Sequence, residues 1–496
     1  MATVSATGLA FAYGDAAPLF HRVDLRLVPG LYGLVGENGA GKSTLLALLA
    51  GALVPGEGRV LRAPVDAIVV TCAQSVQARG DDVVALAERD DRNAVRLRAT
   101  MGLDEAPSER WGTLSPGERK RWQIAAALAR EPDVLFLDEP TNHIDAQGRR
   151  RLVSALASFR GVGVIVSHDR SLLDEVTTRT LRIREGRVDE MPGSYGPARA
   201  EWERQDEALR DRRQALRGQL DTAARKLADA RRRRAAAEHE TSSRARMKGP
   251  RDHDARGMLR KGNAMRAEAS LGKEVGARQS ELARTTSALA GAASAPREPG
   301  GALFVDWVPC PRRSVLSLHA REVRAGEAPC LRDVAMDVGR EERVRIAGAN
   351  GAGKTTLLQA LAGAGAGKSV FYLPQDTHEE SDRRALDAVR ALGPRERGRV
   401  LSFVAALGVD PARLLASNRP SPGEARKLHI ADALGRGVWA LVLDEPTNHL
   451  DLPSVERLEG ALASYPGALV LVTHDDAFAR ACRCETRRIE DGRLTR

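Results

Sequence analysis

The nine residues GENGAGKST (residues 36–44) recur as GANGAGKTT (residues 348–356), 312 positions further along a chain of 496 residues. Each copy follows an apolar run and carries the spacing Gly-x4-Gly-Lys-Ser/Thr. Glycines at these positions let the backbone curl until its N–H groups point inward at phosphate oxygens, next to the positive end of the following helix. The two stretches therefore predict two phosphate-binding loops, each placed between a strand and a helix.

Three further motifs recur in the same order, each 306 positions apart. The pairs are SPGE (residues 115–118 and 421–424), LDEPTNHID and LDEPTNHLD (residues 137–145 and 443–451), and VSHD and VTHD (residues 166–169 and 472–475). Four motifs at nearly one offset indicate a duplicated domain. In each copy strand-like runs alternate with helical segments, which is typical of an α/β domain with a largely parallel sheet.

Composition suggests where the two α/β domains end. We expect the first to cover residues 1–196, ending in the turn-rich MPGSYG. The second is expected to run from residue 300, after the Pro/Gly-rich SAPREPGG, to residue 496. Residues 197–299 between them contain almost no strand formers, so we expect a helical linker.

The linker carries two narrow apolar seams with a spacing of seven residues. Their members are Trp202, Leu209, Leu216 and Ala223, supplemented by Leu220 and Leu227, and then Val275, Leu282 and Leu289. Such seams predict an antiparallel helical hairpin, packed on itself at the base and free for contacts at the tip. Gly249 and Pro250 place the turn at about residues 246–257. Arms of roughly 45 residues would reach about 70 Å.

The linker is also where the charge of the chain is concentrated. Residues 197–295 contain 23 Lys/Arg and 14 Asp/Glu, a balance of +9 within a net charge of +10. A basic segment on a near-neutral body indicates a polyanionic partner. A merely solvated helical face is the alternative, but it explains the concentration of charge poorly.

Several observations bear on the compartment. The longest apolar runs are strand-sized, far short of the ~20 residues that cross a bilayer. The N-terminus MATVSATGLAFAYGD lacks a basic segment followed by an apolar one, so we expect no signal peptide. The five cysteines form no C-x-x-C pair, which favours free thiols in a reducing compartment. We expect a cytoplasmic protein with no membrane partner.

The two loops are predicted to bind ATP and Mg²⁺. Lys42 and its counterpart would reach the β- and γ-phosphates, and the next residue would ligate Mg²⁺ through its hydroxyl. In the first copy the predicted nucleotide contacts are Gly36, Asn38, Gly39, Gly41, Lys42, Ser43 and Thr44. In the second copy they are Gly348, Asn350, Gly351, Gly353, Lys354, Thr355 and Thr356. Asp138 and Asp444 each end an apolar strand and are predicted to join Ser43 and Thr355 around Mg²⁺.

Glu139 and Glu445 follow those aspartates and are predicted to act as general bases toward an attacking water. A capping role for the Asp–Glu pair is the structural alternative. His168 and His474 each lie 29 residues after a glutamate, at the end of another apolar strand. A lone histidine is usually structural, but a matched pair at identical spacing favours contact with the γ-phosphate.

The motifs together resemble an ATP-binding cassette (ABC) ATPase, and the resemblance covers both repeats. Gln74 and Gln375, each at the end of a strand, complete the set as candidates to sense Mg²⁺ or the attacking water. In this family two cassettes enclose two ATP molecules head to tail. The resemblance implies that Asp145 and Asp451 lie at the interface between the two sites.

The same resemblance assigns the SPGE segments to the nucleotide of the opposite cassette. It implies that Ser115 and Gly117 face the ATP on the second loop, and that Ser421 and Gly423 face the ATP on the first. Other positions differ between the copies.

Tyr13, placed to stack on adenine, has Ala325 as its counterpart, and Leu114 before the first SPGE is replaced by Pro420. We therefore expect the two sites to differ in affinity or turnover.

The domain order, the TNH after each strand-end Asp–Glu pair and the charged helical linker after PGSY resemble the ABC-F family. Members are translation factors that bind the ribosomal E site. The resemblance implies a monomer with its two cassettes paired, whose linker points toward ribosomal RNA, the P-site tRNA and the peptidyl transferase centre. Closure on ATP would set the angle of the hairpin.

Within that family we favour antibiotic-resistance ribosome protection against drugs of the peptidyl transferase centre or exit tunnel. Only 40 residues separate Gln74 from Leu114, which leaves no space for the extra helical arm of some housekeeping members. A housekeeping factor that relieves stalled ribosomes is the alternative. A tandem ATPase subunit of a sugar importer is a remote one, because it gives no reason for the basic insert.

Overall fold

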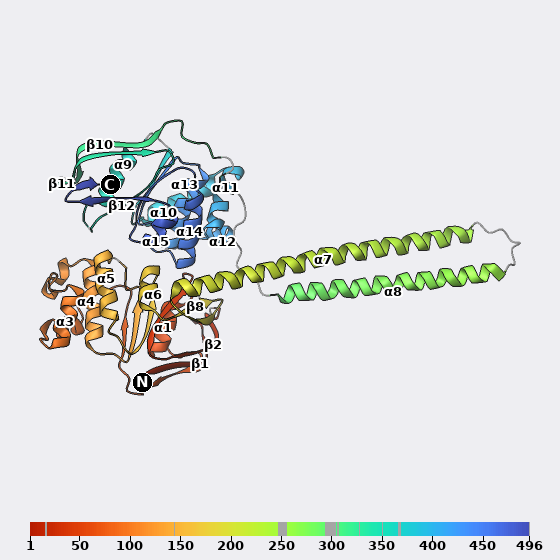
Figure 1. Ribbon diagram of the computed structural model, residues 1–496, viewed down its shortest axis with the longest axis horizontal. Coiled ribbons are helices and arrows are strands. Elements are labelled where there is room, and N and C mark those ends of the chain that lie inside the picture. Colours follow the sequence, from red (N-terminus) through yellow and green to blue (C-terminus); the bar gives the residue numbers. More distant parts are fainter. Residues whose placement is uncertain are drawn as a thin grey trace. The chain divides into compact units, whose positions relative to one another are not determined.

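The computed structural model describes residues 1–14, 17–142, 144–246, 255–292, 304, 307–326, 328–349, 351–365 and 369–495. The chain forms two compact units. Residues 1–198 and 299–496 make up the first, which contains both cassettes, and residues 199–298 make up the second, a two-helix arm (Figure 1). Of the predicted features, Asn350 and most of the predicted turn at residues 246–257 lie outside the described residues.

The first cassette is built on a six-stranded sheet. Its strand order is β5 (Val69–Cys72), β6 (Val134–Asp138), β7 (Val162–Val166), β3 (Gly30–Gly36), β8 (Arg179–Arg184) and β9 (Arg187–Pro192). All pairs are parallel except the last, β8 with β9. The inner strands are continuous apolar runs because helices cover both faces of such a sheet.

Helices and a second, antiparallel sheet complete the first cassette. The helices are α1 (Lys42–Ala50), α2 (Asp81–Glu88), α3 (Arg92–Met101), the 3-10 helix η1 (Ser108–Thr113), α4 (Pro116–Ala129), α5 (Ala146–Leu156) and α6 (Arg170–Val176). The antiparallel sheet has the order β2 (Phe20–Leu27), β1 (Thr3–Phe11), β4 (Glu57–Ala63). Leu9 and Phe20 from this sheet share one core with Leu45 of α1 and Phe136 of β6.

The second cassette repeats this plan. Its six-stranded sheet runs β13 (Val370–Leu373), β14 (Ala440–Asp444), β15 (Ala468–Val472), β12 (Arg343–Ala347), β16 (Glu485–Glu490), β17 (Arg493–Thr495). Strands β10 (Ser314–Ala325) and β11 (Ala328–Gly339) pair antiparallel. The helices are α9 (Lys354–Gly363), α10 (Glu379–Ala391), α11 (Pro394–Ala406), α12 (Pro411–Ala416), α13 (Pro422–Gly435), α14 (Leu452–Ser464) and α15 (Asp476–Ala481).

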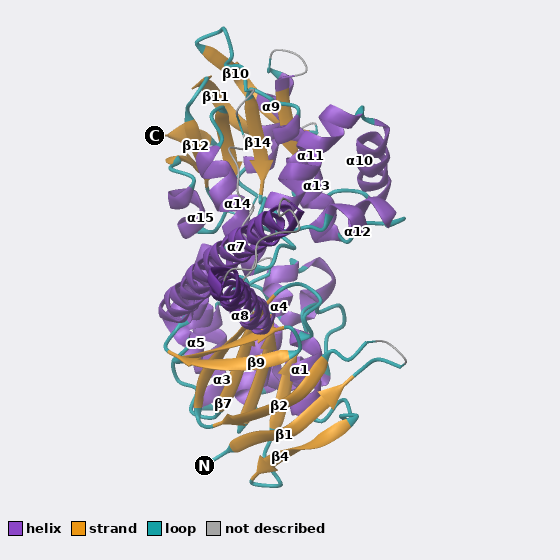
Figure 2. Ribbon diagram, turned by 90° about the vertical axis from the view of Figure 1, so that its right-hand side faces the viewer, coloured by secondary structure: helices purple, strands orange, loops and turns teal. Residues whose placement is uncertain are grey.

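Figure 2 shows α10, α11 and α13 gathered at the side of this cassette away from β10 and β11. The equal strand orders of the two main sheets confirm the duplication and the α/β fold class that the motifs predicted.

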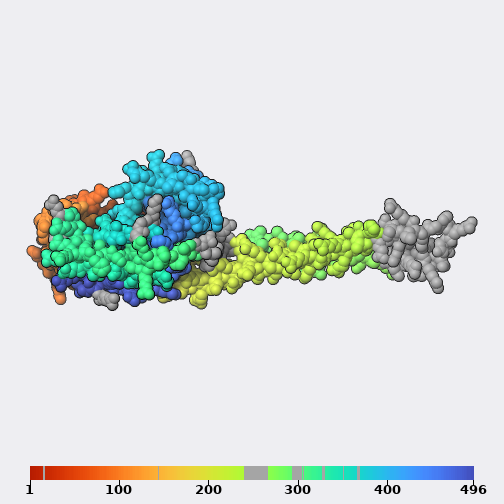
Figure 3. Space-filling view, turned by 90° about the horizontal axis from the view of Figure 1, so that it is seen from above, coloured from red at the N-terminus to blue at the C-terminus, as the bar shows by residue number. Residues whose placement is uncertain are grey.

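The arm consists of α7 (Tyr195–Arg246) and α8 (Ala255–Gly291), which lie side by side (Figures 1 and 3). The predicted helical hairpin is thereby confirmed. The 52 residues of α7 give a helix of about 78 Å. Within the described residues, no helix has both the length and the apolar character that crossing a bilayer requires.

The buried seam of the arm includes members of the predicted heptad pattern, among them Trp202, Ala223, Leu227 and Val275. Leu227, Ala230 and Val275 form its buried core, whereas Leu209 and Leu216 are only half-buried. The ion pair between Arg233 and Glu274 (3.8 Å) fixes the antiparallel register.

In this register Gly291, the last residue of α8, lies opposite Leu216. Leu209 therefore lies beyond the end of α8. The prediction that the arm packs on itself at the base and is free for contacts at the tip stays a prediction, because the side chains of residues 240–265 lie outside the described residues.

Candidate active site

The first phosphate loop connects the end of β3 to the start of α1. Gly39 and Gly41 adopt φ values of 80° and 98°, which a side chain disfavours. A Cβ at Gly41 would lie 2.7 Å from the side chain of Leu19, so only glycine fits there. Lys42 curls back and donates from Nζ to the carbonyl oxygens of Gly36 (2.9 Å) and Glu37 (3.1 Å). The loop thus has the shape that predicts phosphate binding.

The second loop has the same shape in its described part. Gly351 and Gly353 adopt φ values of 80° and 91°. Lys354 Nζ donates to the carbonyls of Gly348 (2.9 Å) and Ala349 (3.0 Å), as Lys42 does in the first loop.

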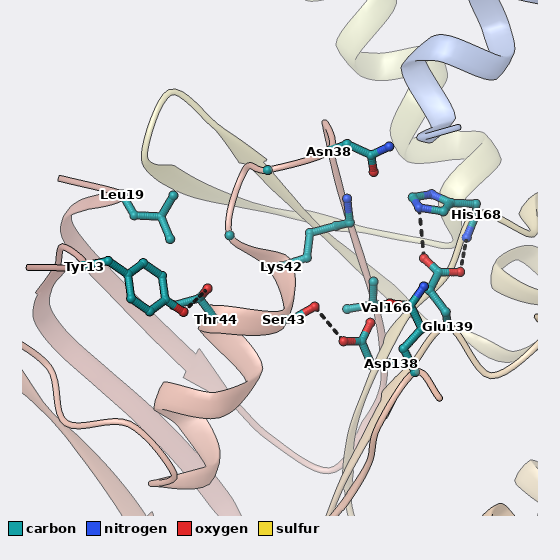
Figure 4. Close-up of a pocket in the computed structure, with 13 residues that line it drawn as sticks. Tyr13, Leu19, Asn38, Lys42, Ser43, Thr44, Asp138, Glu139, Val166 and His168 are labelled. Atoms are coloured by element: carbon teal, nitrogen blue, oxygen red, sulfur yellow. Dashed lines mark hydrogen bonds and ion pairs between the residues drawn. The ribbon is translucent and has the colours of Figure 1, made fainter. Parts of the chain in front are cut away.

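The residues predicted to hold Mg²⁺ are in direct contact in both cassettes. The Ser43 hydroxyl donates to Asp138 Oδ2 at 2.6 Å, and the Thr355 hydroxyl donates to Asp444 Oδ2 at 2.7 Å (Figure 4 shows the first pair). Each hydroxyl comes from the first turn of a helix and each carboxylate from the end of a strand. Hydroxyl and carboxylate oxygens are ligands that Mg²⁺ prefers, so these residues fit the ion.

Glu139 lies at the back of the first site in a left-handed backbone conformation, with φ 47°. Its N–H donates to the carbonyl of Val166 at 2.8 Å. Its Oε1 lies 3.0 Å from His168 Nε2, and its Oε2 accepts the His168 backbone N–H at 3.3 Å (Figure 4). Burial raises the pKa of Glu139, against an opposing effect of Lys42, and burial lowers the pKa of His168 to about 3. The imidazole is therefore neutral at pH 7.

The second site repeats these relations. Glu445 has φ 45°, and its Oε1 lies 3.4 Å from His474 Nε2. Burial raises the pKa of Glu445 to about 8, and the neighbouring charge of Asp444 acts in the same direction. Burial lowers the pKa of His474 to about 4, with Lys354 contributing. In both cassettes a buried carboxyl thus faces a neutral imidazole.

A cavity of about 420 Å³ brings most of the predicted residues of the first site together (Figure 4). It is lined by Tyr13, Leu19, Asn38, Gly39, Gly41, Lys42, Ser43, Thr44, Gln74, Asp138, Glu139, Val166 and His168. The Tyr13 hydroxyl lies 3.0 Å from Thr44 Oγ1, and its ring packs edge-on against Phe11 with 4.9 Å between centroids. Tyr13 remains 56% exposed, which leaves its ring accessible to a base.

In the second cassette, Thr356 lies in the first turn of α9 and Gln375 follows β13. The SPGE serines cap the helices that follow them. Ser115 Oγ accepts the N–H of Glu118 at 3.2 Å, and Ser421 Oγ accepts that of Glu424 at 3.3 Å. Because each glutamate in turn accepts its serine's N–H, α4 and α13 both begin with a complete capping box.

Residues of the second cassette contact the first phosphate loop. The Asn38 N–H donates to Asp451 Oδ2 at 2.6 Å, and its side-chain amide donates to the His449 carbonyl at 2.9 Å. A Cβ on Gly423 would lie 3.5 Å from the Asn38 amide nitrogen. Ser115 and Gly117 lie at the start of α4. The equivalent contact on the second phosphate loop would involve Asn350, the counterpart of Asn38, which lies outside the described residues.

Motif reasoning missed a buried ion pair that joins α6 to α14. Arg170 donates to both carboxylate oxygens of Glu459, and it also lies 3.8 Å from Asp475. The Tyr195 hydroxyl, at the start of α7, donates to Glu456 at 2.6 Å. The sequence pointed to this ion pair in one way only: Arg170 directly follows VSHD, whereas an aspartate follows VTHD in the second copy.

A phosphate loop, a hydroxyl–carboxylate pair, a buried glutamate and a neutral histidine, present twice in one chain, define a tandem ABC-type ATPase. The profile of the ABC transporter family matches residues 20–142 and 331–448. The tylosin resistance ATP-binding protein TlrC of Streptomyces fradiae is 33% identical, over 95% of this chain and 94% of its own length. The ribosome protection protein VmlR of Bacillus subtilis is 27% identical, over 96% of this chain and 84% of its own.

Among solved structures, the RNase-L Inhibitor shares the fold, with a TM-score of 0.61 at 19% identity, covering 98% of this chain and 90% of its own. The chain belongs to the ABC-F family of tandem-cassette ATPases. It binds and hydrolyses ATP.

Proposed function

We propose that this ATPase binds the ribosome and protects it from antibiotics that act at the peptidyl transferase centre or the exit tunnel. In this proposal ATP holds the two cassettes together, the arm enters from the E site toward the P-site tRNA, and hydrolysis releases the protein. The observation that carries the proposal is a basic two-helix arm inserted between two complete ATPase cassettes.

The proposed chemistry assigns one role to each residue of a site. Lys42 and Lys354, with the loop amides, bind the β- and γ-phosphates of ATP. The pairs Ser43–Asp138 and Thr355–Asp444 would hold Mg²⁺, which supplies positive charge to the phosphate oxygens when bound. Gln74, Gln375 and the neutral histidines orient the γ-phosphate and the attacking water. Tyr13 stacks on the adenine of the first site.

Glu139 and Glu445 would accept the proton of the attacking water. The water oxygen forms a bond to the γ-phosphorus, the bond from that phosphorus to the β–γ bridging oxygen breaks, and ADP and phosphate result. A glutamate can take the proton only when it is ionised. The high pKa that burial gives Glu445, about 8, makes the carboxylate a stronger base than an exposed one.

The arm offers cations to a polyanion. Residues 231–234 of α7 are four consecutive arginines, all exposed. Arg234 pairs with Glu238 at 2.8 Å, and Arg233 lies 3.8 Å from Glu274. Arg231 and Arg232 form no ion pair with the part of the arm that the structure describes. Helices of this kind bind RNA through its phosphates and its shape.

The relatives support the ribosome as the polyanion and resistance as the role. One is named as a tylosin resistance protein and matches this chain over nearly the full length of both. Another is named as a ribosome protection protein. Together with the basic arm, these relatives favour ribosome protection over an importer subunit.

Drug susceptibility tests the proposal. The chain is expressed in a susceptible bacterial strain, and inhibitory concentrations are measured for a panel of peptidyl-transferase and exit-tunnel drugs. We expect a rise of fourfold or more for at least one class, and no rise for drugs that do not act on the ribosome. A variant with Glu139→Gln and Glu445→Gln, expressed at the same level, is the matched control and should lose the protection. No rise for any drug would contradict the resistance role and favour a housekeeping translation factor.

A further inference from the structure

Each cassette buries a cation five residues after the SPGE serine, near the start of the helix that follows, and α13 also buries the neighbouring Lys427. Lys120 lies in α4 and Arg426 lies in α13, 306 positions apart, and each is only 2% exposed. The two positions are therefore equivalent in the duplication, although their side chains differ. A buried charge is costly unless it is well satisfied, so the partners of each cation indicate its role.

The partners of Lys120 are backbone carbonyls at the edge of the first site. Its Nζ donates to Ala73 (2.5 Å), to Gln74 (3.4 Å) and to Asp138 (3.1 Å). The first two carbonyls belong to the segment that carries the candidate sensor glutamine. The third belongs to the peptide that joins Asp138 to Glu139. One ammonium group thus connects α4, the glutamine segment and the end of β6.

Arg426 makes the same connection in the second cassette with different geometry. Its guanidinium donates to the carbonyl of Gln375 and, at 2.8 Å, to the carbonyl of Glu445. Arg426 therefore binds the carbonyl of the glutamate itself, whereas Lys120 binds the carbonyl of the aspartate before the glutamate. In both cassettes the cation nevertheless holds a peptide group directly adjoining the buried glutamate.

These peptide groups set the direction of the glutamate side chains. Glu139 and Glu445 have φ values of 47° and 45°, a conformation that a residue with a Cβ rarely adopts without support. In the first cassette the peptide between Asp138 and Glu139 is held at both ends, because its N–H donates to Val166 and its carbonyl accepts from Lys120. Without the cation, the peptide could rotate toward a more common φ and turn the carboxyl away from His168.

We propose that Lys120 and Arg426 are positioning residues for ATP hydrolysis. Each fixes the backbone of the glutamate and of the sensor glutamine in one arrangement, and each links both to the helix that begins at the SPGE serine. This inference rests on the proposed role of Glu139 and Glu445 as general bases. The two cations contact neither nucleotide nor water in this scheme, so they act on kcat through the position of the glutamates.

Paired substitutions at both cations test the inference on the purified full-length chain. In the double variant Lys120→Met/Arg426→Met the side chains keep an unbranched stem and lose their charge and their hydrogen-bond donors. We expect kcat for ATP hydrolysis to fall at least tenfold, while KM for ATP and the affinity for a fluorescent ATP analogue stay within twofold. The exchange variant Lys120→Arg/Arg426→Lys restores a cation at each position and should keep at least a third of the wild-type kcat.

Arg343, which is partly buried, supplies a control for the loss of a cation that donates to backbone carbonyls away from the phosphate loop. It lies at the start of β12, the strand end away from the phosphate loop, and donates to the carbonyls of Leu462 (2.8 Å) and Cys482 (3.0 Å). We expect Arg343→Met to lower Tm while leaving kcat within twofold. If Arg343→Met lowers kcat as much as the double methionine variant does, the effect is general destabilisation and the inference is wrong.

Further outcomes would also overturn the inference. They are a kcat within twofold of wild type in the double methionine variant, a KM that rises as kcat falls, and an exchange variant as inactive as the methionine variant. Should the double variant not fold, each single methionine variant is measured, with at least a twofold loss of kcat at unchanged KM expected. No loss in either contradicts the inference. Because no ribosome is present in this assay, its outcome is independent of the drug test.

Discussion

At the scale of single residues, both sites combine a buried glutamate with a neutral imidazole. Burial raises the pKa of Glu445 to about 8 and lowers that of His474 to about 4. The two groups therefore titrate on opposite sides of neutrality, and of this pair only the glutamate changes charge between pH 6 and pH 9. This separation allows kinetics to distinguish the carboxyl from the imidazole.

The pH dependence of kcat/KM follows from these directions. A general base works when deprotonated, so the rate should rise as pH increases and level off above the pKa of the free enzyme. We expect a single rising limb with a midpoint near pH 8, measured as steady-state ATPase activity between pH 5.5 and 9.5. A midpoint near pH 6.5 would assign the limb to an exposed histidine instead. The variant with Glu139→Gln and Glu445→Gln should show no limb above its residual rate.

Tyr13 gives a prediction specific to the first site. Stacking of an aromatic ring contributes about 0.5–1.5 kcal/mol, which corresponds to roughly a 2- to 12-fold change in affinity. Tyr13→Ala should weaken ATP binding at one of the two sites by about that factor, measured by calorimetry in the Glu139→Gln/Glu445→Gln background. Tyr13→Phe loses only the hydroxyl contact with Thr44 and should bind within twofold of the parent. Unchanged binding in Tyr13→Ala would show that the ring does not contact the nucleotide.

Contiguous motifs made most site residues predictable, because a phosphate loop needs its glycines, lysine and hydroxyl within nine positions. Lys120, Arg426 and Arg170 were missed for a physical reason. Their partners are backbone carbonyls or a carboxylate on a distant helix, and backbone groups leave no trace in the sequence. A lone cation on a helix therefore looks the same whether it is solvated or buried.

At the scale of elements, the inner parallel strands and the hairpin were predictable, and the antiparallel sheets were not. Fully buried runs such as ALVLD (residues 440–444) signal a central parallel strand by themselves. Strand β1 is half-buried, mixes polar and apolar residues and breaks its register with both partners. The alternation of buried and exposed residues along β1 is thereby interrupted, so hydrophobic periodicity did not identify it as a strand.

The exposed arginines of α7 give a prediction for the arm. Each phosphate contact that is lost should reduce the slope of log affinity against log salt by about 0.7–0.9. In the ATP-trapped double glutamine variant, Arg231→Gln/Arg232→Gln should therefore flatten the salt dependence of ribosome binding by about 1.4–1.8 units.

Arg278→Gln/Arg284→Gln on α8 is the control for this measurement. It removes the same charge, but Arg278 already pairs with Glu281 at 2.8 Å and Arg284 donates to the Ser280 carbonyl. The slope should change less in this control. Equal slopes in both variants would show that residues 231 and 232 contribute only net charge.

At the scale of the whole molecule, the unit that contains both cassettes has a contact that the duplication does not repeat. Arg170 of α6 pairs with Glu459 of α14, and both side chains are buried. The counterpart of Arg170 is Asp476, and the counterpart of Glu459 is Val153. The same ion pair therefore cannot form between the equivalent residues. The contact between the two cassettes is thus chemically different at these two equivalent places.

This ion pair gives a stability prediction. Removing one partner of a buried pair typically costs about 3–5 kcal/mol, because the other charge is left unpaired, whereas replacing both with apolar residues costs much less. Arg170→Met and Glu459→Leu should each lower Tm by more than Arg170→Met/Glu459→Leu does. Thermal denaturation of the four proteins forms a double-mutant cycle. Additive losses would show that the two side chains are not coupled in solution.

The central claim is that ATP held by both cassettes attaches the basic arm to the ribosome. Co-sedimentation of the Glu139→Gln/Glu445→Gln variant with 70S ribosomes, with and without ATP, tests it most directly. The account predicts that most of the protein pellets with ribosomes when ATP is present, and that little does without nucleotide or when Lys42→Ala and Lys354→Ala are added. Equal pelleting in every condition, or none in any, would contradict it.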